Sequence, residues 1–323
     1  MGRFLVRRVL FMLLVLFVLS ILTFVIFLKL PAGDPARLVA GKAATAETIA
    51  DAREALGLDQ PWYVQYGRFA KGLVPVPGWW LNEQVYFNWG NNVPVWEEIK
   101  TRFPWTLALT IGGAILWLLI GIPLGILSAV KRGKWQDRAG MLFALFGVSA
   151  PVFWLGLVFL YVFWYKLGWL PGSGVAPGET VWEAVLRGAF ILPWITIAIT
   201  SAAFYTRMVR GNMIETMSED YIRTARAKGL SERKVIYKHT LRASLTPVVT
   251  MLGLDIGFML GGAVITETVF ALPGLGLYAI DSIYRNNMPG TMAVTIISAL
   301  FIVVANLIVD VVYAVLDPRV RYE

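Results

Sequence analysis

Long apolar runs are the feature that most constrains this chain. A helix of about 20 apolar residues, rising 1.5 Å per residue, crosses the roughly 30 Å hydrocarbon core of a bilayer. Only 15% of the residues are charged, whereas soluble domains carry about 25%. The sequence therefore predicts an all-α integral membrane protein with six transmembrane helices. These cover approximately Leu5–Leu30, Trp105–Val130, Ala139–Tyr165, Phe190–Tyr205, Leu245–Val269 and Thr291–Leu316, with Pro193 interrupting the fourth near its start.

The positive charges predict the orientation of these helices, because short cytoplasmic loops are enriched in Lys and Arg. The two ends of the chain and the loops at residues 131–138 and 207–242 hold 18 Lys or Arg, while the alternate short loops hold 3. Both termini and the two basic loops are therefore expected in the cytoplasm. The predicted organisation is an N-terminal transmembrane helix at 1–30, an external segment at 31–104, and a five-helix core at 105–323 that contains a cytoplasmic loop at 207–243.

The external segment follows the first helix as one long loop. Its stretch "TAETIADAREALGLDQPW" (residues 45–62) predicts an exposed helix that ends at Gly57, since Ala, Glu and Leu favour helices and glycine ends them. The tract Pro75–Val95, rich in Trp and Asn, has no evident role and is interpreted as an insertion.

Several kinds of chemistry are excluded by composition. The sequence has no cysteine and one histidine, His239, so disulfides, thiolate metal sites and His-pair zinc sites are impossible. The phosphate-binding pattern G-x-x-x-x-G-K-[ST] is also absent, which predicts a chain that does not hydrolyse ATP. An intramembrane enzyme is disfavoured because a single histidine in a loop and the lack of cysteine leave no nucleophile–base pair or metal site inside the spans. A secondary transporter stays as an alternative, although the chain shows no internal repeat.

The stretch "SEDYIRTARAKGLSERKVIYKHTLRA" (residues 218–243) is the densest basic segment of the chain. It predicts a short helix with Ser218 as N-cap and Tyr221, Ile222 and Ala225 on one face. Gly229 is expected in a left-handed turn that ends this helix. Ser231 and Glu232 would then cap the N-terminus of a second helix. A small apolar face with a cationic rim fits docking on the anionic membrane surface or in a groove of a cytoplasmic partner. The alternative is that the charges serve only to set the topology.

Residues 220–249, "DYIRTARAKGLSERKVIYKHTLRASLTPVV", resemble the coupling loop of the permease subunits of bacterial ABC importers. They are most similar to the peptide branch, the dipeptide and oligopeptide permeases of the type I fold, in which "RTARAKGL" is characteristic. Arg223 and Thr224 depart from the general pattern of the wider family, while Ala225 and Gly229 match it. The motifs "PAGDP" (31–35), "LGLDQPWYVQYGRF" (56–69), "SAPVFWLGLVFLYVFWYKLGWLPGSG" (149–174) and "GGAVITETVFALPGLG" (261–276) extend the resemblance in the same order along the chain.

The resemblance implies the type I importer permease fold, a place in the inner membrane of a bacterial cell and a role as half of a translocation pathway for peptides. Its implied partners are a homologous second permease in a heterodimer, two cytoplasmic P-loop ATPase subunits that carry ATP and Mg²⁺, and an extracytoplasmic binding protein. Nickel chelates, glutathione and oligosaccharides are alternative substrates. The residues implied to couple to the ATPase are Tyr221, Ile222, Arg223, Thr224, Ala225, Arg226, Ala227, Lys228, Gly229 and Leu230.

Two acidic residues are candidates for the translocation path. Asp255 lies near the middle of the fifth predicted span, where a charge is costly unless it faces protein or water. It is expected either to line the path or to form a buried hydrogen bond with a neighbouring helix. Glu267 lies near the external mouth and is expected in a gate or at the contact with the binding protein, or in a structural role.

Overall fold

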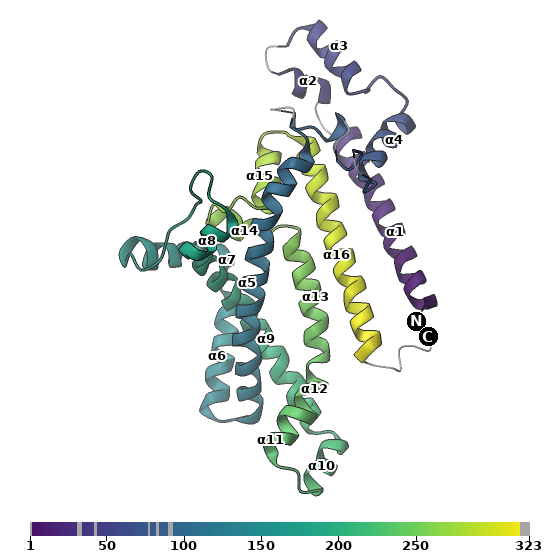
Figure 1. The fold of residues 1–323 in the computed structure, drawn as a ribbon. Coiled ribbons are helices and arrows are strands. Elements are labelled where there is room, and N and C mark those ends of the chain that lie inside the picture. The colour runs from purple at the N-terminus through teal and green to yellow at the C-terminus, as the bar shows by residue number, and fades with distance from the viewer. Residues whose placement is uncertain are drawn as a thin grey trace. The chain divides into compact units, whose positions relative to one another are not determined.

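The computed structural model describes residues 2–30, 34–41, 44–76, 78–81, 84–89 and 93–316 (Figure 1). In this part of the chain the regular elements are helices, and Phe87 and Pro94 form an isolated bridge. The chain divides into two compact units. The first comprises Met1–Thr106, Gly257–Val264 and Pro273–Leu307, and the second comprises Leu107–Ile256, Ile265–Leu272 and Ile308–Glu323. Arg319 and Arg321, which support the predicted orientation, lie outside the described residues.

Three helices of the described chain are individually long and apolar enough to cross a membrane. They are α1 (Gly2–Phe24) with its continuation η1 (Val25–Lys29), α5 (Val95–Val130) and α16 (Met288–Leu316). Three bent pairs also qualify, and counting each pair as one span gives the predicted six. The pairs are α6 (Trp135–Ser149) with α7 (Val152–Phe159) and η3 (Leu160–Lys166); α8 (Val181–Arg187) with α9 (Ile191–Met217); and residues Glu232–Ser244 with α13 (Thr246–Leu260).

The third predicted span, Ala139–Tyr165, is not one continuous helix. The chain bends by 100° between Trp135–Ser149 and Val152–Lys166, because Pro151 has no N–H and forces the residue before it out of the helical region. Ala150 is accordingly extended, with ψ 122°. Pro193, in contrast, does not interrupt the fourth span. It lies in the first turn of α9, where backbone N–H groups have no helical partner to lose.

Two further boundaries differ from the prediction. Helix α9 continues to Met217, so the segment predicted as a loop from residue 207 begins with three more helical turns. The fifth predicted span, Leu245–Val269, is divided into α13 and α14 (Val264–Val269). The division lies at Gly262, whose φ is +123°, and a Cβ there would lie 2.6 Å from the Cα of Gly276. Only glycine fits both this conformation and this close backbone approach.

The first unit carries the short helices α2 (Pro35–Ala40), α3 (Ala46–Ala55), α4 (Trp62–Leu73), η2 (Gln84–Tyr86) and α15 (Leu275–Tyr284). The Thr45 hydroxyl caps α3 by accepting from the N–H of Thr48 at 3.3 Å. Gly57 follows α3 with φ +63°, which confirms the predicted helix end. The external-segment helix is therefore fixed by its own local sequence signals.

The tract Pro75–Val95 contributes to the core of the first unit. Leu81 and Tyr86 are buried, and the Tyr86 hydroxyl donates to the carbonyl of Phe69 at 3.0 Å. The Asn88 Oδ1 atom accepts from the Tyr278 hydroxyl at 2.6 Å. The described part of this tract is thus a packed element of the first unit.

Close helix packing organises the second unit. Helix α6 packs along α9, and glycines on α5 and α6 let the backbones of these helices approach that of α9. A Cβ on Gly147 would lie 2.5 Å from the Ala203 Cβ, and one on Gly125 would lie 2.6 Å from the Val209 Cβ. Small residues at helix crossings are what permits such contact in membranes. The remaining helical elements of this unit are α10 (Asp220–Ala227), α11 (Glu232–Lys234), η4 (Val235–Thr240) and α12 (Leu241–Ser244).

An ion pair adds to this packing. The Asp137 carboxylate, in the first turn of α6, accepts from the Arg210 guanidinium of α9 at 2.6 and 3.0 Å and from the N–H of Gly133 at 2.9 Å. The Asp137 side chain is buried, so this bidentate pair fixes the register of α6 on α9.

Two glycines on α5 provide a matched test of this packing. A Cβ on Gly125 would also lie 2.9 Å from the Thr206 carbonyl oxygen, whereas one on Gly113 would meet the Ile197 Cγ2 at an ordinary 3.5 Å. We expect Gly125→Ala to lower the thermal unfolding midpoint of the detergent-solubilised protein, because overpacking costs about 1–3 kcal/mol. Gly113→Ala should leave the midpoint unchanged or raise it, because alanine favours helix. Equal midpoints for the two variants would contradict the packing described.

Candidate functional site

The basic segment folds as a helical hairpin at the end of α9. Helix α10 begins after Glu219, and the Thr224 hydroxyl donates to the Asp220 carbonyl at 2.9 Å. The predicted N-cap, Ser218, instead ends α9, where its hydroxyl donates to the Glu215 carbonyl at 2.6 Å. The N-cap prediction is wrong because α9 continues further than expected and uses Ser218 for its own last turn.

The turn between the two helices confirms the left-handed glycine. Gly229 has φ +76°, and its N–H donates to the Arg226 carbonyl at 2.9 Å. The space around a Cβ at Gly229 is open within 4 Å, so the constraint on this position is the backbone conformation. Ser231 then begins the second helix as its N-cap residue, although its side chain makes no capping hydrogen bond.

A small apolar core holds this hairpin together. Ile222 and Val235 are fully buried and Ala225 is nearly so, and the three form one cluster. Tyr221 was predicted on the same face, but it is 48% exposed. Successive helical residues are about 100° apart, so Tyr221 turns outward when Ile222 turns inward.

The outer surface of the hairpin is exposed and of mixed character. Within residues 221–230 every side chain except those of Ile222 and Ala225 is exposed: Tyr221, Arg223, Thr224, Arg226, Ala227, Lys228 and Leu230, with Gly229 at the turn. The large apolar side chains of Tyr221 and Leu230, together with the exposed Lys and Arg side chains, form a surface suited to a groove with apolar and acidic groups.

An ion pair joins the two helices of the hairpin. The Arg226 guanidinium donates to the Glu232 carboxylate through Nη2 at 2.8 Å and Nε at 3.2 Å. This hydrogen bond raises the pKa of Arg226. The two side chains are 39% and 58% exposed, so the pair contributes at most about 1 kcal/mol to stability. Glu232 therefore pairs across the turn, where the sequence predicted a helix cap.

Side-chain hydrogen bonds tie the hairpin to α9. The Asn212 amide donates to the Ser244 carbonyl at 3.3 Å, and the Ser244 hydroxyl is 3.1 Å from the Thr216 hydroxyl. Between the hairpin and the ends of α5 and α9 is a cleft of about 460 Å³. It is lined by Ala129, Val130, Arg132, Ile214, Met217, Ser218, Arg226, Glu232 and Ile236. The hairpin is thus hydrogen-bonded to α9 through Ser244 of α12. The cleft lies between the hairpin and the last turns of α5 and α9.

Asp255, on α13, is held by a residue that sequence reasoning missed. The Tyr205 hydroxyl of α9 donates to Asp255 Oδ2 at 2.7 Å. Tyr205 and Trp117 of α5 are fully buried, with ring centroids 6.1 Å apart. Asp255 itself is partly exposed. Tyr205 ends the fourth predicted span, and it lies near the middle of a helix only because α9 continues to Met217.

Glu267 lies in α14 and is fully buried. Its neighbour Thr266 is buried as well, and the Glu267 carbonyl accepts from the N–H of Leu272 at 2.9 Å. In this structure Glu267 has no surface available to a path or to a binding protein.

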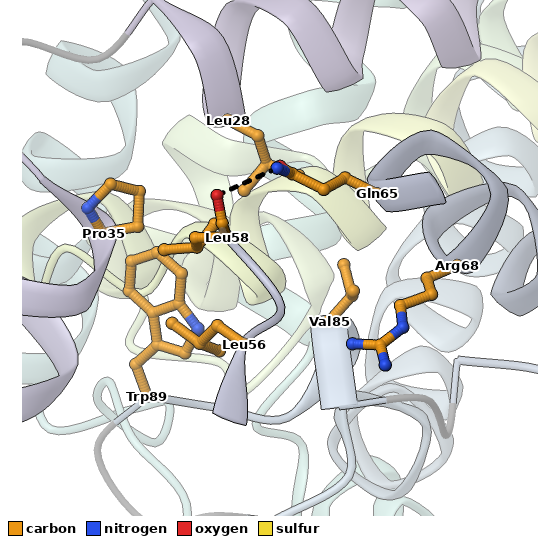
Figure 2. A pocket seen from close by; sticks show the side chains of 8 residues that line it. All are labelled: Leu28, Pro35, Leu56, Leu58, Gln65, Arg68, Val85 and Trp89. Carbon is orange, nitrogen blue, oxygen red and sulfur yellow. Dashed lines mark hydrogen bonds between the residues drawn. The ribbon is translucent and has the colours of Figure 1, made fainter. Parts of the chain in front are cut away.

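A small pocket in the first unit is lined by Gln65, whose side chain is fully hydrogen-bonded within the fold (Figure 2). The Gln65 amide donates to the carbonyls of Leu58 and Gln60 at 3.1 and 2.7 Å, and its oxygen accepts from Lys29 at 2.7 Å. The Arg68 guanidinium packs on Gly57, where a Cβ would lie 2.3 Å from Nη1. The remaining lining is apolar apart from Trp89: Leu28, Pro35, Leu56, Leu58 and Val85. Within the described residues, no three His, Cys, Asp or Glu side chains gather into a possible metal site.

Comparison with known families covers nearly the whole chain. Residues 121–322 match the family described as binding-protein-dependent transport system inner membrane component. Residues 1–110 match the N-terminal part of binding-protein-dependent transport system membrane components.

Individual proteins agree with these matches. The glutathione transport system permease protein GsiC of Salmonella paratyphi A and that of Escherichia coli K12 are each 40% identical over 323 residues, which is 100% of this chain and of each relative. Two inward-facing structures of the MetNI methionine ABC transporter share the fold, with TM-scores of 0.54 and 0.52 at 19% and 20% identity. They cover 69% and 68% of this chain and 98% of the solved chain. The chain belongs to the binding-protein-dependent inner membrane components and is a transmembrane permease subunit of an ABC importer.

Proposed function

We propose that this permease couples to a cytoplasmic ATPase through residues 218–243. The exposed α10, with its left-handed turn at Gly229, is the observation that carries the proposal. The hairpin offers Tyr221 and Leu230 as apolar contacts and a cationic rim for orientation. Hydrogen bonds between α12 and α9 give a displacement of α10 a direct route to a long helix of the second unit.

The chain works as one half of an assembly. The sequence lacks a phosphate-binding loop, so ATP and Mg²⁺ bind to two separate P-loop ATPase subunits. A homologous second permease completes a heterodimer around the translocation path, and an extracytoplasmic binding protein delivers the substrate. The family description as a binding-protein-dependent component supports this arrangement.

Orientation and organisation follow the charge distribution. Both termini and the basic loops at 131–138 and 207–243 face the cytoplasm, and residues 31–104 lie outside between the helix at 1–30 and the core at 105–323. The 18 to 3 distribution of Lys and Arg supports this topology.

The transported substrate is a short peptide, and glutathione is the specific candidate. The full-length 40% identity to glutathione permeases supports this choice, and glutathione is itself a tripeptide. Asp255 lines the path at mid-span. Glu267, being buried, joins the path only where α14 rearranges to expose it.

Gly229 gives the first test of coupling. We expect Gly229→Val to abolish coupled transport, because a β-branched residue in the left-handed conformation costs at least about 1–2 kcal/mol and misdirects α10. Gly229→Asn is the matched control, since asparagine tolerates this conformation. The measurement is ATP hydrolysis of the reconstituted importer stimulated by the substrate-loaded binding protein, with membrane insertion checked in parallel. Full coupled transport by Gly229→Val would reduce the segment to a topology signal.

Arg226 distinguishes an ATPase contact from an internal brace. Arg226→Glu is expected to weaken co-purification of the ATPase, and added salt should deepen the defect. Exchanging both charges, Arg226→Glu with Glu232→Arg, restores the ion pair across the turn but reverses the charge offered to the partner. We expect the exchanged protein to remain defective. Recovery of ATPase binding in the exchanged protein would assign Arg226 to bracing the hairpin alone.

Reporter fusions test the topology. A reporter inserted at the exposed Gly133 turn and one fused after Glu323 should report the cytoplasm, while one inserted at the exposed Asp59 should report the exterior. A cytoplasmic signal at Asp59 would overturn the proposed orientation.

A further inference from the structure

We propose that Asp255 receives the ammonium group of the substrate as it crosses the membrane. This inference rests on the proposed function as a peptide importer and names the chemical group that the path recognises. Asp255 lies within a span helix, is held in a fixed geometry and has hydrogen-bonding capacity that the described residues do not use.

Asp255 lies inside α13, one of the helices that make up the candidate membrane spans. It is nine residues beyond the start of α13 at Thr246 and five before its end at Leu260, so more than one helical turn separates it from either end. A carboxylate at that depth faces water, a cation or a polar protein group, because exposure to lipid is costly.

The carboxylate is held by a rigid scaffold. Tyr205 donates to Oδ2, and its ring is packed on Trp117. A Cβ on Gly121 of α5 would lie 2.9 Å from the Tyr205 Cβ, so the tyrosine has little room to shift. Asp255 therefore presents its remaining oxygen in a defined direction.

That remaining oxygen is available. Within the described residues, Tyr205 is the only hydrogen-bond partner of Asp255, and no Lys, Arg or His forms an ion pair with it. Asp255 is also partly exposed. A single negative charge with a free acceptor suits a small cation that carries N–H donors. Peptides and glutathione carry such an ammonium group, whereas neutral oligosaccharides do not.

One such contact fits transport, because a site on a path must attract the substrate and still release it. Tyr205 donates to one of the two carboxylate oxygens, so the other can accept from the substrate without a closed cage of donors. Asp255 is thus a specificity residue for ammonium-bearing substrates.

The test uses the full importer, reconstituted with its second permease, ATPases and binding protein. Uptake of glutathione and of N-acetylglutathione is measured with binding protein loaded equally by each, so that selection by the binding protein is removed. Wild type should import glutathione about tenfold faster than the N-acetylated probe. Asp255→Asn, which keeps the shape and the Tyr205 bond, should erase this difference, and Asp255→Glu should retain it.

Three outcomes separate the alternatives. The inference is overturned if Asp255→Asn prefers glutathione over the N-acetylated probe as strongly as wild type does. It is also overturned if Asp255→Asn impairs permease assembly while the transporter that remains keeps the preference. Should the wild-type complex neither import glutathione nor hydrolyse ATP when the binding protein is loaded, the proposed function fails instead.

Discussion

Close contact of α9 with its neighbours is the constraint on which the second unit depends. Gly121, Gly125 and Gly147 have no side chain to hold the helices apart. Backbone atoms of α9 lie closer to these glycines than a Cβ would allow. In a membrane, where lipid competes equally for apolar surface, such packing is what associates helices. The Asp137–Arg210 pair then fixes the axial position of α6 against α9. With that register set, Tyr205 points to Asp255 and Ser218 ends the helix where the hairpin begins.

Helix α9 consequently links the two proposed sites, the hairpin and Asp255. Its middle carries Tyr205, and its C-terminal part carries Asn212 and Thr216, which hydrogen-bond to Ser244 of α12. A helix packed this closely moves as a rigid body, since its interfaces leave no space for local adjustment. A force on α10 and a change near Asp255 are therefore expected to act on the same element. The cleft of about 460 Å³ beside the hairpin leaves room for α10 to move without breaking the attachment at its base.

The hairpin has little stability of its own, but its turn has a defined conformation. Its interior is only Ile222, Ala225 and Val235, and its ion pair is exposed, so its stability alone is small. Gly229 nevertheless fixes the direction of the turn through backbone conformation, which does not depend on the amount of buried surface. A partner groove can then receive a surface of defined shape.

The sequence by itself determined the membrane class, the number of spans, the helix ending at Gly57 and the turn at Gly229. These depend on apolar run length and on glycine conformation, which are local properties. The break of the third span at Pro151 is also a local effect, because proline forces the residue before it out of the helical region. Only the tertiary structure decided that Gly262 divides another span and that α9 extends to Met217. It also decided that Tyr221 faces outward, that Asp255 has Tyr205 as its partner and that Glu267 is buried. Those outcomes depend on which residues distant in the chain come together, and no local pattern encodes the close backbone approaches that bring them there.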